Sequence, residues 1–319
     1  MAKSKPVTKH SNLIILLPVY EDRQALRHLL VDLKKELGSG FVVCAVDDGS
    51  LNAPPLLEDF QDVGVNGEII RLRRNVGHQK AIAAGLCYIN ENYNFEHVVI
   101  MDSDGEDKPS TIKDLLAVLT DDKIDVAVAE RRSRVESLKF KVFYFFYKIV
   151  FGLLTGRPVS FGNFMALKPG AVARMCTINE LWLHIAGAVI LSRLRIQTVA
   201  IDRGSRYAGQ SKMNFPSLVL HGFRGIMVFT EDVLVRVGIA CFLLLIPISF
   251  AVVLTLVLKL VGMASPGWFS SAMALLFIIL IQIGFLNLMM LLVAGMGNRQ
   301  PPTTEIRLQN LIMKIEETV

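Results

Sequence analysis

The stretch HVVIMDSDGED, residues 97–107, decides the fold. Its apolar run, 97–101, leads directly into four acidic residues: Asp102, Asp104, Glu106 and Asp107. A short apolar run that ends in a polar cluster is typical of a strand buried on both faces of a parallel sheet. We therefore predict a strand over 97–101 whose carboxyl end carries acidic side chains.

The same pattern recurs on both sides of this stretch. The four further runs are LIILL (13–17), FVVCAV (41–46), EIIRL (68–72) and DVAVA (125–129). The segments between them are predicted helices: 24–37 places its leucines on one face, and 78–90 and 110–119 behave similarly. Strands that alternate with helices predict a mostly parallel, Rossmann-like α/β sheet with helices on both faces. Ligands of such sheets bind at the carboxyl ends of the strands.

Two other predicted strands end in polar loops of the same kind. Pro18-Val19-Tyr20-Glu21 follows the first strand, and Asp47-Asp48-Gly49-Ser50 follows the second. Asp102 and Asp104, two residues apart in an extended chain, direct their carboxylates to the same side. Such a pair repels itself unless a cation lies between, and oxygen ligands at an open site suit Mg²⁺ or Mn²⁺. A lone D-x-D often occurs by chance, but its position beside two acidic loops favours a metal site.

The composition of the 319-residue chain points toward a membrane. Apolar residues make up 52% of it, the mean hydropathy is +0.45 and the formal net charge is +5. Such a chain suits an anionic bilayer surface or phosphate-bearing substrates better than nucleic acid. The four cysteines form neither a C-x-x-C pair nor a zinc pattern, so we expect buried, reduced thiols. The first apolar run is too short for a signal-peptide core, so we expect the large domain to stay in the cytosol.

The last third of the chain contains two long apolar runs, 237–258 and 268–294. The first would extend roughly 33 Å as a helix, enough to cross a bilayer core. The linker 261–267 is short and uncharged, which predicts a transmembrane hairpin. The flanking basic residues place both ends of the hairpin in the cytosol; they are Arg224, Arg236, Arg299 and Arg307. Two buried helices of a soluble protein are the alternative.

Two further helices are expected beside the membrane. Residues 138–154 combine aromatic residues with Lys139, Lys141 and Lys148, which is the pattern of an interfacial helix. An ordinary core helix fits that pattern equally well. Residues 214–233 are a candidate for a second, juxtamembrane helix.

The ordered motifs of the chain resemble those of the family 2 glycosyltransferases of GT-A fold. The motifs are PVYED (18–22), VDDGS (46–50), RRNVGHQKAIAAGL (73–86), DSDGED (102–107) and RYAGQSKMN (206–214). The branch they resemble most is that of the polyprenyl-phosphate glycosyltransferases, which includes dolichol-phosphate mannose synthases and the bacterial GtrB and ArnC types. The resemblance covers nearly the whole chain, including the hairpin.

This resemblance implies a role for each matching residue. The nucleotide-sugar would be bound by Pro18, Tyr20, Glu21, Asp48, Arg74, Asn75, Gly77, Lys80, Asp102 and Ser211. The metal ligands would be Asp102 and Asp104, joined by Glu106 where the family often has Gln. The catalytic set would be Asp104, Asp107, which faces the transferred sugar, and Arg206 and Lys212, which close over the phosphates. Arg131 and Arg134 would hold the acceptor phosphate, although a solvated charge cluster explains them nearly as well. Between Thr177 and Val199 the sequence departs from that branch, so we expect Glu180, Trp182 and His184 to shape a different sugar pocket, with core packing the alternative for Trp182.

The expected organisation has five segments. They are a nucleotide-sugar-binding half, 1–133; an acceptor-side half with the amphipathic helix and the G-x-S-K loop, 134–213; a juxtamembrane helix, 214–235; the transmembrane hairpin, 236–296; and a cytosolic tail, 297–319.

The expected activity is inverting transfer of a sugar from a nucleotide-sugar, UDP rather than GDP, to an undecaprenyl or dolichyl phosphate. The expected partners are that donor, the lipid acceptor, the membrane and further copies of the chain, but not nucleic acid, and the expected location is a bacterial inner membrane. A processive polysaccharide synthase is disfavoured, because no Q-x-x-R-W motif is present. A dinucleotide-binding enzyme is disfavoured as well, because no G-x-G-x-x-G follows the first strand. The sequence also contains no P-loop. A glycolipid synthase acting on a lipid hydroxyl and a non-catalytic membrane scaffold stay open.

Overall fold

The computed structural model describes residues 9–131, 138–157, 162–207, 215–265, 267–297 and 304–318. The chain divides into two compact units. The first, here called the sheet domain, comprises Met1–Lys141, Val159–Val228 and Pro302–Val319. The second, here called the helical unit, comprises Val142–Pro158 and Phe229–Pro301.

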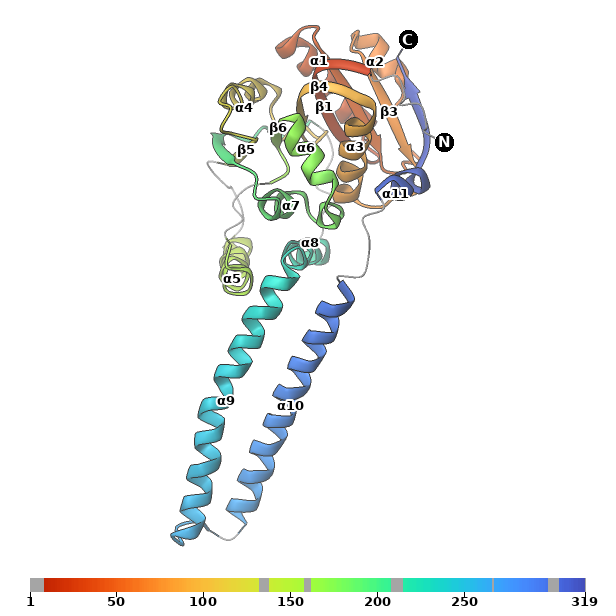
Figure 1. Ribbon diagram of the computed structural model, residues 1–319. Coiled ribbons are helices and arrows are strands. Elements are labelled where there is room, and N and C mark those ends of the chain that lie inside the picture. The colour runs from red at the N-terminus through yellow and green to blue at the C-terminus, as the bar shows by residue number, and fades with distance from the viewer. Residues whose placement is uncertain are drawn as a thin grey trace. The chain divides into compact units, whose positions relative to one another are not determined.

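Four parallel strands form the centre of the sheet domain (Figure 1). They are β1 (Lys9–Val19), β2 (Phe41–Asp47), β3 (Gly67–Leu72) and β4 (Tyr93–Ile100). β1 pairs in parallel with β2 and with β4, and β2 pairs in parallel with β3. The first four predicted strands and their parallel arrangement are therefore confirmed.

The sheet is extended at both edges by strands of mixed direction. These are β5 (Val126–Arg131), β6 (Met165–Leu167), β7 (Ile196–Ile201) and β8 (Ile312–Glu317). The full order is β7-β5-β6-β4-β1-β2-β3-β8. β6 is antiparallel to both β4 and β5, and β8 is antiparallel to β3. β5 matches the fifth predicted strand, whereas the other three were not predicted from the sequence.

Helices cover both faces of this sheet. The helices and 3₁₀ turns of the sheet domain are α1 (Arg23–Leu37), α2 (Leu57–Val63), α3 (His78–Asn92), η1 (Pro109–Thr111), α4 (Ile112–Val118), α6 (Pro169–Cys176), η2 (Asn179–Trp182), α7 (Ile185–Leu191), α8 (Phe215–Met227) and α11 (Thr304–Leu311). The three predicted helices correspond to α1, α3 and α4. All four cysteine side chains are buried, as predicted.

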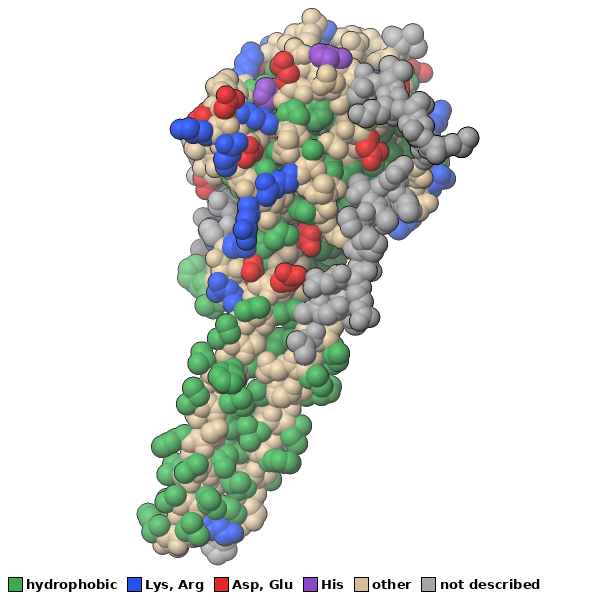
Figure 2. All heavy atoms as spheres, viewed as in Figure 1, with side chains coloured by type: hydrophobic (Ala, Val, Ile, Leu, Met, Phe, Trp, Pro, Cys, Tyr) green, Lys and Arg blue, Asp and Glu red, His purple; other side chains and the backbone are tan. Residues whose placement is uncertain are grey.

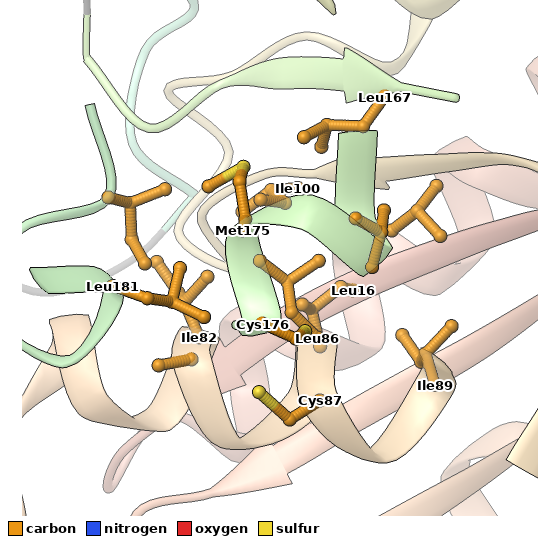
Figure 3. Packing of buried hydrophobic residues seen from close by; sticks show 14 of the residues in the cluster. Leu16, Ile82, Leu86, Cys87, Ile89, Ile100, Leu167, Met175, Cys176 and Leu181 are labelled. Atoms are coloured by element: carbon orange, nitrogen blue, oxygen red, sulfur yellow. The ribbon is translucent and has the colours of Figure 1, made fainter. Parts of the chain in front are cut away.

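β1 explains how the two cores form. Ile14 and Leu16 belong to the core under α3, α6 and α7, whereas Ile15 and Leu17 belong to the core under α1, α2 and α4. Successive strand side chains point to opposite faces, so a continuous apolar run is what a sheet covered on both faces requires. Figure 3 shows part of the first core, where strand, α3 and α6 side chains interdigitate.

The segment after the long helices is part of the sheet domain. Residues 297–319 were predicted as a tail, but α11 and β8 belong to the unit that holds the sheet. Leu308 of α11 is buried in the core under α3, and β8 becomes an edge strand of the sheet.

The helical unit is built on two long apolar helices, α9 (Thr230–Leu260) and α10 (Trp268–Gly297), which pack against each other. Their length and composition are sufficient to cross a membrane over Thr230–Leu260 and Trp268–Met290. Figure 2 shows apolar side chains exposed along both helices. The predicted spans 237–258 and 268–294 fall inside these helices. The predicted helix 214–235 differs, because α8 ends at Met227 and α9 already begins at Thr230.

The aromatic helix α5 (Leu138–Thr155) matches the predicted segment 138–154. The part of it in the helical unit packs against the start of α9 through Phe151 and Phe229, whose rings meet edge to face at 6.0 Å. Arg157, just beyond α5, forms an ion pair of 3.1 Å with Asp232. Phe145 and Leu153 are exposed, and the interfacial role of α5 stays a prediction.

The two-sided burial of β1 gives a test of the fold. Replacing Leu16 by Ala should lower the free energy of unfolding by about 2–5 kcal/mol, because it leaves a cavity between strand and α3. The matched substitution Val31→Ala lies on an exposed position of α1 and should change this free energy by less than about 0.5 kcal/mol. Equal losses in denaturant unfolding of the two variants would contradict the assignment of Leu16 to the core.

Candidate active site

The carboxyl ends of the four central strands meet at one edge of the sheet (Figure 1). In the strand register Val19 lies opposite Asp47, and Asp47 lies opposite Arg71. Leu16 of β1 lies opposite Ile100, the last residue of β4. The three predicted polar loops therefore leave the sheet side by side, because parallel neighbours end at the same edge.

Asp48 joins the loops that follow β2 and β3. Its carboxylate is buried and accepts hydrogen bonds from the backbone N–H groups of Val76 at 2.7 Å and Gly77 at 2.9 Å. Burial raises the pKa of Asp48, and these two hydrogen bonds oppose the shift. The predicted nucleotide-binding residues Asp48 and Gly77 are thus in direct contact.

Gly49 allows the same two loops to approach each other closely. Its φ is +75°, and a Cβ at this position would lie 2.7 Å from the carbonyl carbon of Arg74 and from the amide nitrogen of Asn75. Only glycine accommodates both the left-handed backbone and this close approach. Arg74 and Asn75 are exposed beside this contact, as is Lys80 in the first turn of α3.

Glu21 shapes the loop after β2. Its carboxylate accepts hydrogen bonds from the backbone N–H groups of Leu51, Asn52 and Ala53. These bonds, led by the one from Leu51, lower the pKa of Glu21. Its own N–H donates to Ser50 Oγ at 2.8 Å. Glu21 therefore holds the edge loops in position, and its predicted contact with the nucleotide stays a prediction.

The other predicted residues of the first loop lie at the same edge. Pro18 is buried, and its carbonyl accepts a hydrogen bond from Ser103 Oγ at 3.2 Å. Tyr20 follows β1 with 42% of its surface exposed. The first loop and the acidic loop are thereby joined through Pro18, with an exposed aromatic ring beside them.

The acidic loop after β4 is turned by its own side chains. Asp107 is buried and accepts a hydrogen bond from the backbone N–H of Asp102 at 2.9 Å. Asp104 Oδ1 accepts one from the backbone N–H of Glu106 at 3.0 Å. These bonds gather the four predicted acidic residues in one short loop.

His78 is a member of the site that the sequence reasoning did not single out. Its Nε2 lies 3.2 Å from Asp102 Oδ1 and 3.1 Å from Asn163 Nδ2. Burial is the largest influence on the pKa of His78 and lowers it, but the attraction to Asp102 and other carboxylates outweighs burial and leaves the pKa raised. The sequence signal that could have identified His78 is its position as a titratable residue at the start of α3, directly after Gly77.

Two arginines from the loop after β7 neutralise the acidic loop. Arg206 NH2 lies 2.7 Å from Asp104 Oδ2 and 3.4 Å from Glu106 Oε1, and Arg203 forms an ion pair with Glu106. Burial and repulsion from Asp102 raise the pKa of Asp104, against the opposing pull of these arginines. Arg206 was predicted at this site, whereas Arg203 was not.

The backbone fixes the arginine loop on the acidic loop. Gly204 N–H donates to the Glu106 carbonyl at 2.8 Å, and Tyr207 N–H donates to the Asp104 carbonyl at 2.9 Å. The Tyr207 ring covers Gly105, and its hydroxyl donates a hydrogen bond to Asp32 of α1. The positions of the two arginines therefore depend on several contacts besides their ion pairs.

Some predicted residues cannot be placed at the site. Arg131 ends β5 opposite Ile201 of β7, and its side chain lies outside the described residues. Arg134, Ser211 and Lys212 lie outside them as well. Trp182, predicted for the sugar pocket or for core packing, is buried in the core under α3.

The site offers oxygen ligands for a cation. Within the described residues, no three or more His, Cys, Asp or Glu side chains converge as a complete metal site. Asp102 and Asp104 supply two carboxylates in one loop, and burial together with repulsion from Asp102 raises the pKa of Asp104. This donor set fits a hard cation such as Mg²⁺, which typically takes one or two carboxylates and completes its shell with substrate phosphates and water.

A small cavity of about 20 Å³ lies next to the acidic loop. Its lining combines charged and apolar side chains: Glu106, Asp107, Ala129, Phe164, Ile201 and Arg203. A buried carboxylate, an arginine and apolar side chains therefore surround this cavity on the β5–β7 side of the acidic loop.

Comparison with known proteins agrees with this geometry. The model of the family "Glycosyl transferase family 2" matches residues 14–169. An uncharacterized glycosyltransferase of Synechocystis sp., sll0501, is 28% identical over 83% of this chain and 85% of its own. The uncharacterized glycosyltransferase YkoT of Bacillus subtilis is 25% identical over 87% of this chain and 84% of its own.

The fold is also that of solved enzymes. Glucosyl-3-phosphoglycerate synthase from Mycobacterium tuberculosis, in complex with Mn²⁺, UDP and glucosyl-3-phosphoglycerate, aligns with a TM-score of 0.51 at 14% identity. The alignment covers 70% of this chain and 80% of that one. The same synthase has been solved with Mg²⁺ and UDP. At this identity the likeness establishes the GT-A fold of the sheet domain.

Gly49 provides a test of the interlocked loops. Gly49→Ala should reduce the free energy of unfolding by about 1–3 kcal/mol, because it forces a side chain into a left-handed backbone against Arg74. Gly40→Ala is the matched control, since a Cβ there meets nothing within 4 Å. Thermal unfolding that affects both variants alike would argue against the close approach of the loops.

Proposed function

We propose that the chain, whose residues 14–169 match the model of the family "Glycosyl transferase family 2", transfers a sugar from a nucleotide-sugar to a polyprenyl phosphate at a membrane surface. The observation that carries the proposal is the joint presence, in one chain, of an arginine-compensated acidic edge and two long apolar helices. The first suits a diphosphate and its cation, and the second suits a lipid substrate.

The donor would lie across the interlocked loops. The contact between the two loops is made by Asp48, Gly49 and Gly77. The side chains exposed beside this contact are Tyr20, Arg74 and Lys80. An exposed aromatic ring and basic side chains suit a nucleoside and its phosphates. UDP is favoured over GDP, and the fold neighbour crystallised with UDP supports that choice.

Departure of the nucleoside diphosphate is the step that most needs stabilisation. A bound Mg²⁺ or Mn²⁺ would supply Lewis-acid stabilisation of the diphosphate, with Asp102 and Asp104 as ligands. Arg206 is already oriented at Asp104, from where its guanidinium can bind phosphate oxygens once the carboxylate has another partner. Lys212 is proposed to act with it. Charges fixed in this way stabilise the leaving group with little reorganisation.

The acceptor needs little activation. A phosphate oxygen is anionic at neutral pH, so it can attack the anomeric carbon in line without a strong general base, with inversion of configuration. Arg203 lines the cavity beside the acidic loop and would bind the acceptor phosphate there, in place of or together with the predicted Arg131 and Arg134.

The helical unit would keep the prenyl chain near the membrane. α9 and α10 expose apolar side chains along their length, and α5 exposes Phe145 and Leu153. We propose that α9 and α10 cross the bilayer as a hairpin with the sheet domain in the cytosol, as the basic residues Arg224 and Arg236 at its start favour. The proposed location is a bacterial inner membrane.

A glycolipid synthase that uses a lipid hydroxyl is the second candidate. Asp107 is buried and lines the pocket, and a carboxylate in that position suits a general base for a hydroxyl acceptor. A phosphate acceptor does not need such a base. The acceptor is therefore the feature that separates the two candidates.

The acidic loop provides the first functional test. Asp104→Ala should reduce sugar transfer by about 10²-fold or more. The variant lacks a ligand for the cation that binds the diphosphate, and it lacks the carboxylate that orients Arg206. Asp114→Ala, in the exposed first turn of α4, should retain wild-type activity. Turnover of radiolabelled nucleotide-sugar at the wild-type rate by the Asp104 variant would refute the proposed metal ligand.

The acceptor can be identified by product analysis. Purified protein is incubated with a panel of UDP- and GDP-sugars and either a short prenyl phosphate or a diacylglycerol. The proposal predicts a lipid product from the prenyl phosphate that mild acid hydrolyses, as expected of a sugar phosphate. An acid-stable product formed only from diacylglycerol would instead support the glycolipid synthase.

A further inference from the structure

The chain returns to the sheet after its two apolar helices, and this return segment, residues 304–318, contacts the loops of the candidate active site. β8 pairs with β3 from Glu68 opposite Glu317 to Leu72 opposite Ile312. Arg73 N–H donates to the carbonyl of Leu311, the last residue of α11, at 2.9 Å. Arg73 is the first residue of the loop that carries Arg74, Asn75 and Gly77, so the return segment holds this loop at its origin.

A second connection runs through Arg71 of β3. Its Nε and NH2 donate to the two carboxylate oxygens of Glu316 in β8, at 2.9 and 3.0 Å. Its NH1 donates to Asp47 Oδ2 at 2.9 Å, and its NH2 also donates to the Pro55 carbonyl at 2.9 Å. The Arg71 side chain is only 13% exposed. A bidentate pair of this kind fixes the plane of the guanidinium as well as its position.

Asp47 connects Arg71 to the loop after β2, where the donor is proposed to bind. Its side chain is 3% exposed, and its Oδ1 accepts the backbone N–H of Ser50 at 3.0 Å. Ser50 Oγ in turn accepts the N–H of Glu21. The turn that contains Asp48 and Gly49 is therefore held at one end by a carboxylate whose other oxygen is fixed by Arg71.

We propose that Glu316 and Arg71 are positioning residues for the nucleotide, so that the segment beyond the two apolar helices sets the affinity for the donor. Neither side chain needs to touch the nucleotide. Glu316 orients Arg71, Arg71 orients Asp47, and Asp47 shapes the loop on which the donor lies. The inference rests on the proposed function, because it takes the loops after β2 and β3 as the donor site.

A simpler role for β8 is to cover the edge of β3, which would otherwise be exposed to pairing with other chains. The two roles differ in what one carboxylate does. Backbone pairing along β8 does not need the Glu316 side chain, whereas orientation of Arg71 does. Glu317 gives a matched control, because its carboxylate contacts Lys9 rather than Arg71. Glu316 also contacts Lys314 at 3.2 Å, so Lys314→Gln is the control for that pair.

The experiment compares Glu316→Gln, Glu317→Gln and Lys314→Gln in the full-length purified protein. The dissociation constant of UDP is measured by calorimetry, KM and kcat with UDP-sugar, and the thermal midpoint without nucleotide. We expect Glu316→Gln to raise the UDP dissociation constant and KM about tenfold, the effect of one lost charge-assisted hydrogen bond, with kcat within twofold. The two control variants should stay within twofold of wild type in every quantity.

A double-mutant cycle identifies the route of the effect. Combined with Arg71→Gln, the Glu316→Gln substitution should add less than twofold to the dissociation constant, because both act through Asp47. An additive effect of the two substitutions would overturn the proposed relay.

Unchanged UDP affinity in a folded Glu316→Gln variant would overturn the proposal and leave β8 as an edge cover. If that variant does not fold, Glu316→Asp decides the question: its shorter carboxylate should raise the dissociation constant, and an unchanged value would count against the relay. A wild-type protein that binds no nucleoside diphosphate would instead refute the proposed function.

Discussion

Several carboxylates lie at the carboxyl ends of the central strands, next to the apolar cores on both faces of the sheet. The arrangement of the site depends on neutralising these charges. Asp48, Asp104 and Asp107 are buried or half-buried, where a charge is costly without a partner. Each has one: Asp48 and Asp107 accept backbone N–H groups, and Asp104 pairs with Arg206. Burial and repulsion from Asp102 nevertheless raise the pKa of Asp104, against the pull of the arginines. A divalent cation brought by a diphosphate would add positive charge between Asp102 and Asp104.

The compensating groups come from distant parts of the sequence. Arg203 and Arg206 follow β7, about a hundred residues beyond the acidic loop, and they reach it because β5 and β7 extend the sheet on that side. On the other side of the sheet, where β8 pairs with β3, Arg71 is likewise paired with the carboxylate of Glu316. The sheet therefore serves as a frame that brings cations to carboxylates from both sides.

The central part of this arrangement could be predicted from the sequence because it depends on local patterns. Apolar runs ending in polar clusters identified β1 to β5, and the parallel order of the central strands placed Asp48, Asp102 and Asp104 at the same ends of the sheet. β6 was missed because three residues are too few to show a period, and β8 because IMKIEE is half polar and follows an apolar hairpin. His78 and Arg203 were missed for a related reason: only the fold brings them to the acidic loop. The start of α9 at Thr230 was missed because its first turn carries Glu231 and Asp232, outside the apolar run.

The central claim is that clustered carboxylates act through a divalent cation on a diphosphate leaving group. Its most direct test is the initial rate of sugar transfer to a prenyl phosphate as free Mg²⁺ or Mn²⁺ is titrated from zero in a chelator buffer. The account predicts no measurable transfer without the cation, and a saturable recovery as it is restored. A full rate in the complete absence of divalent ions would contradict it.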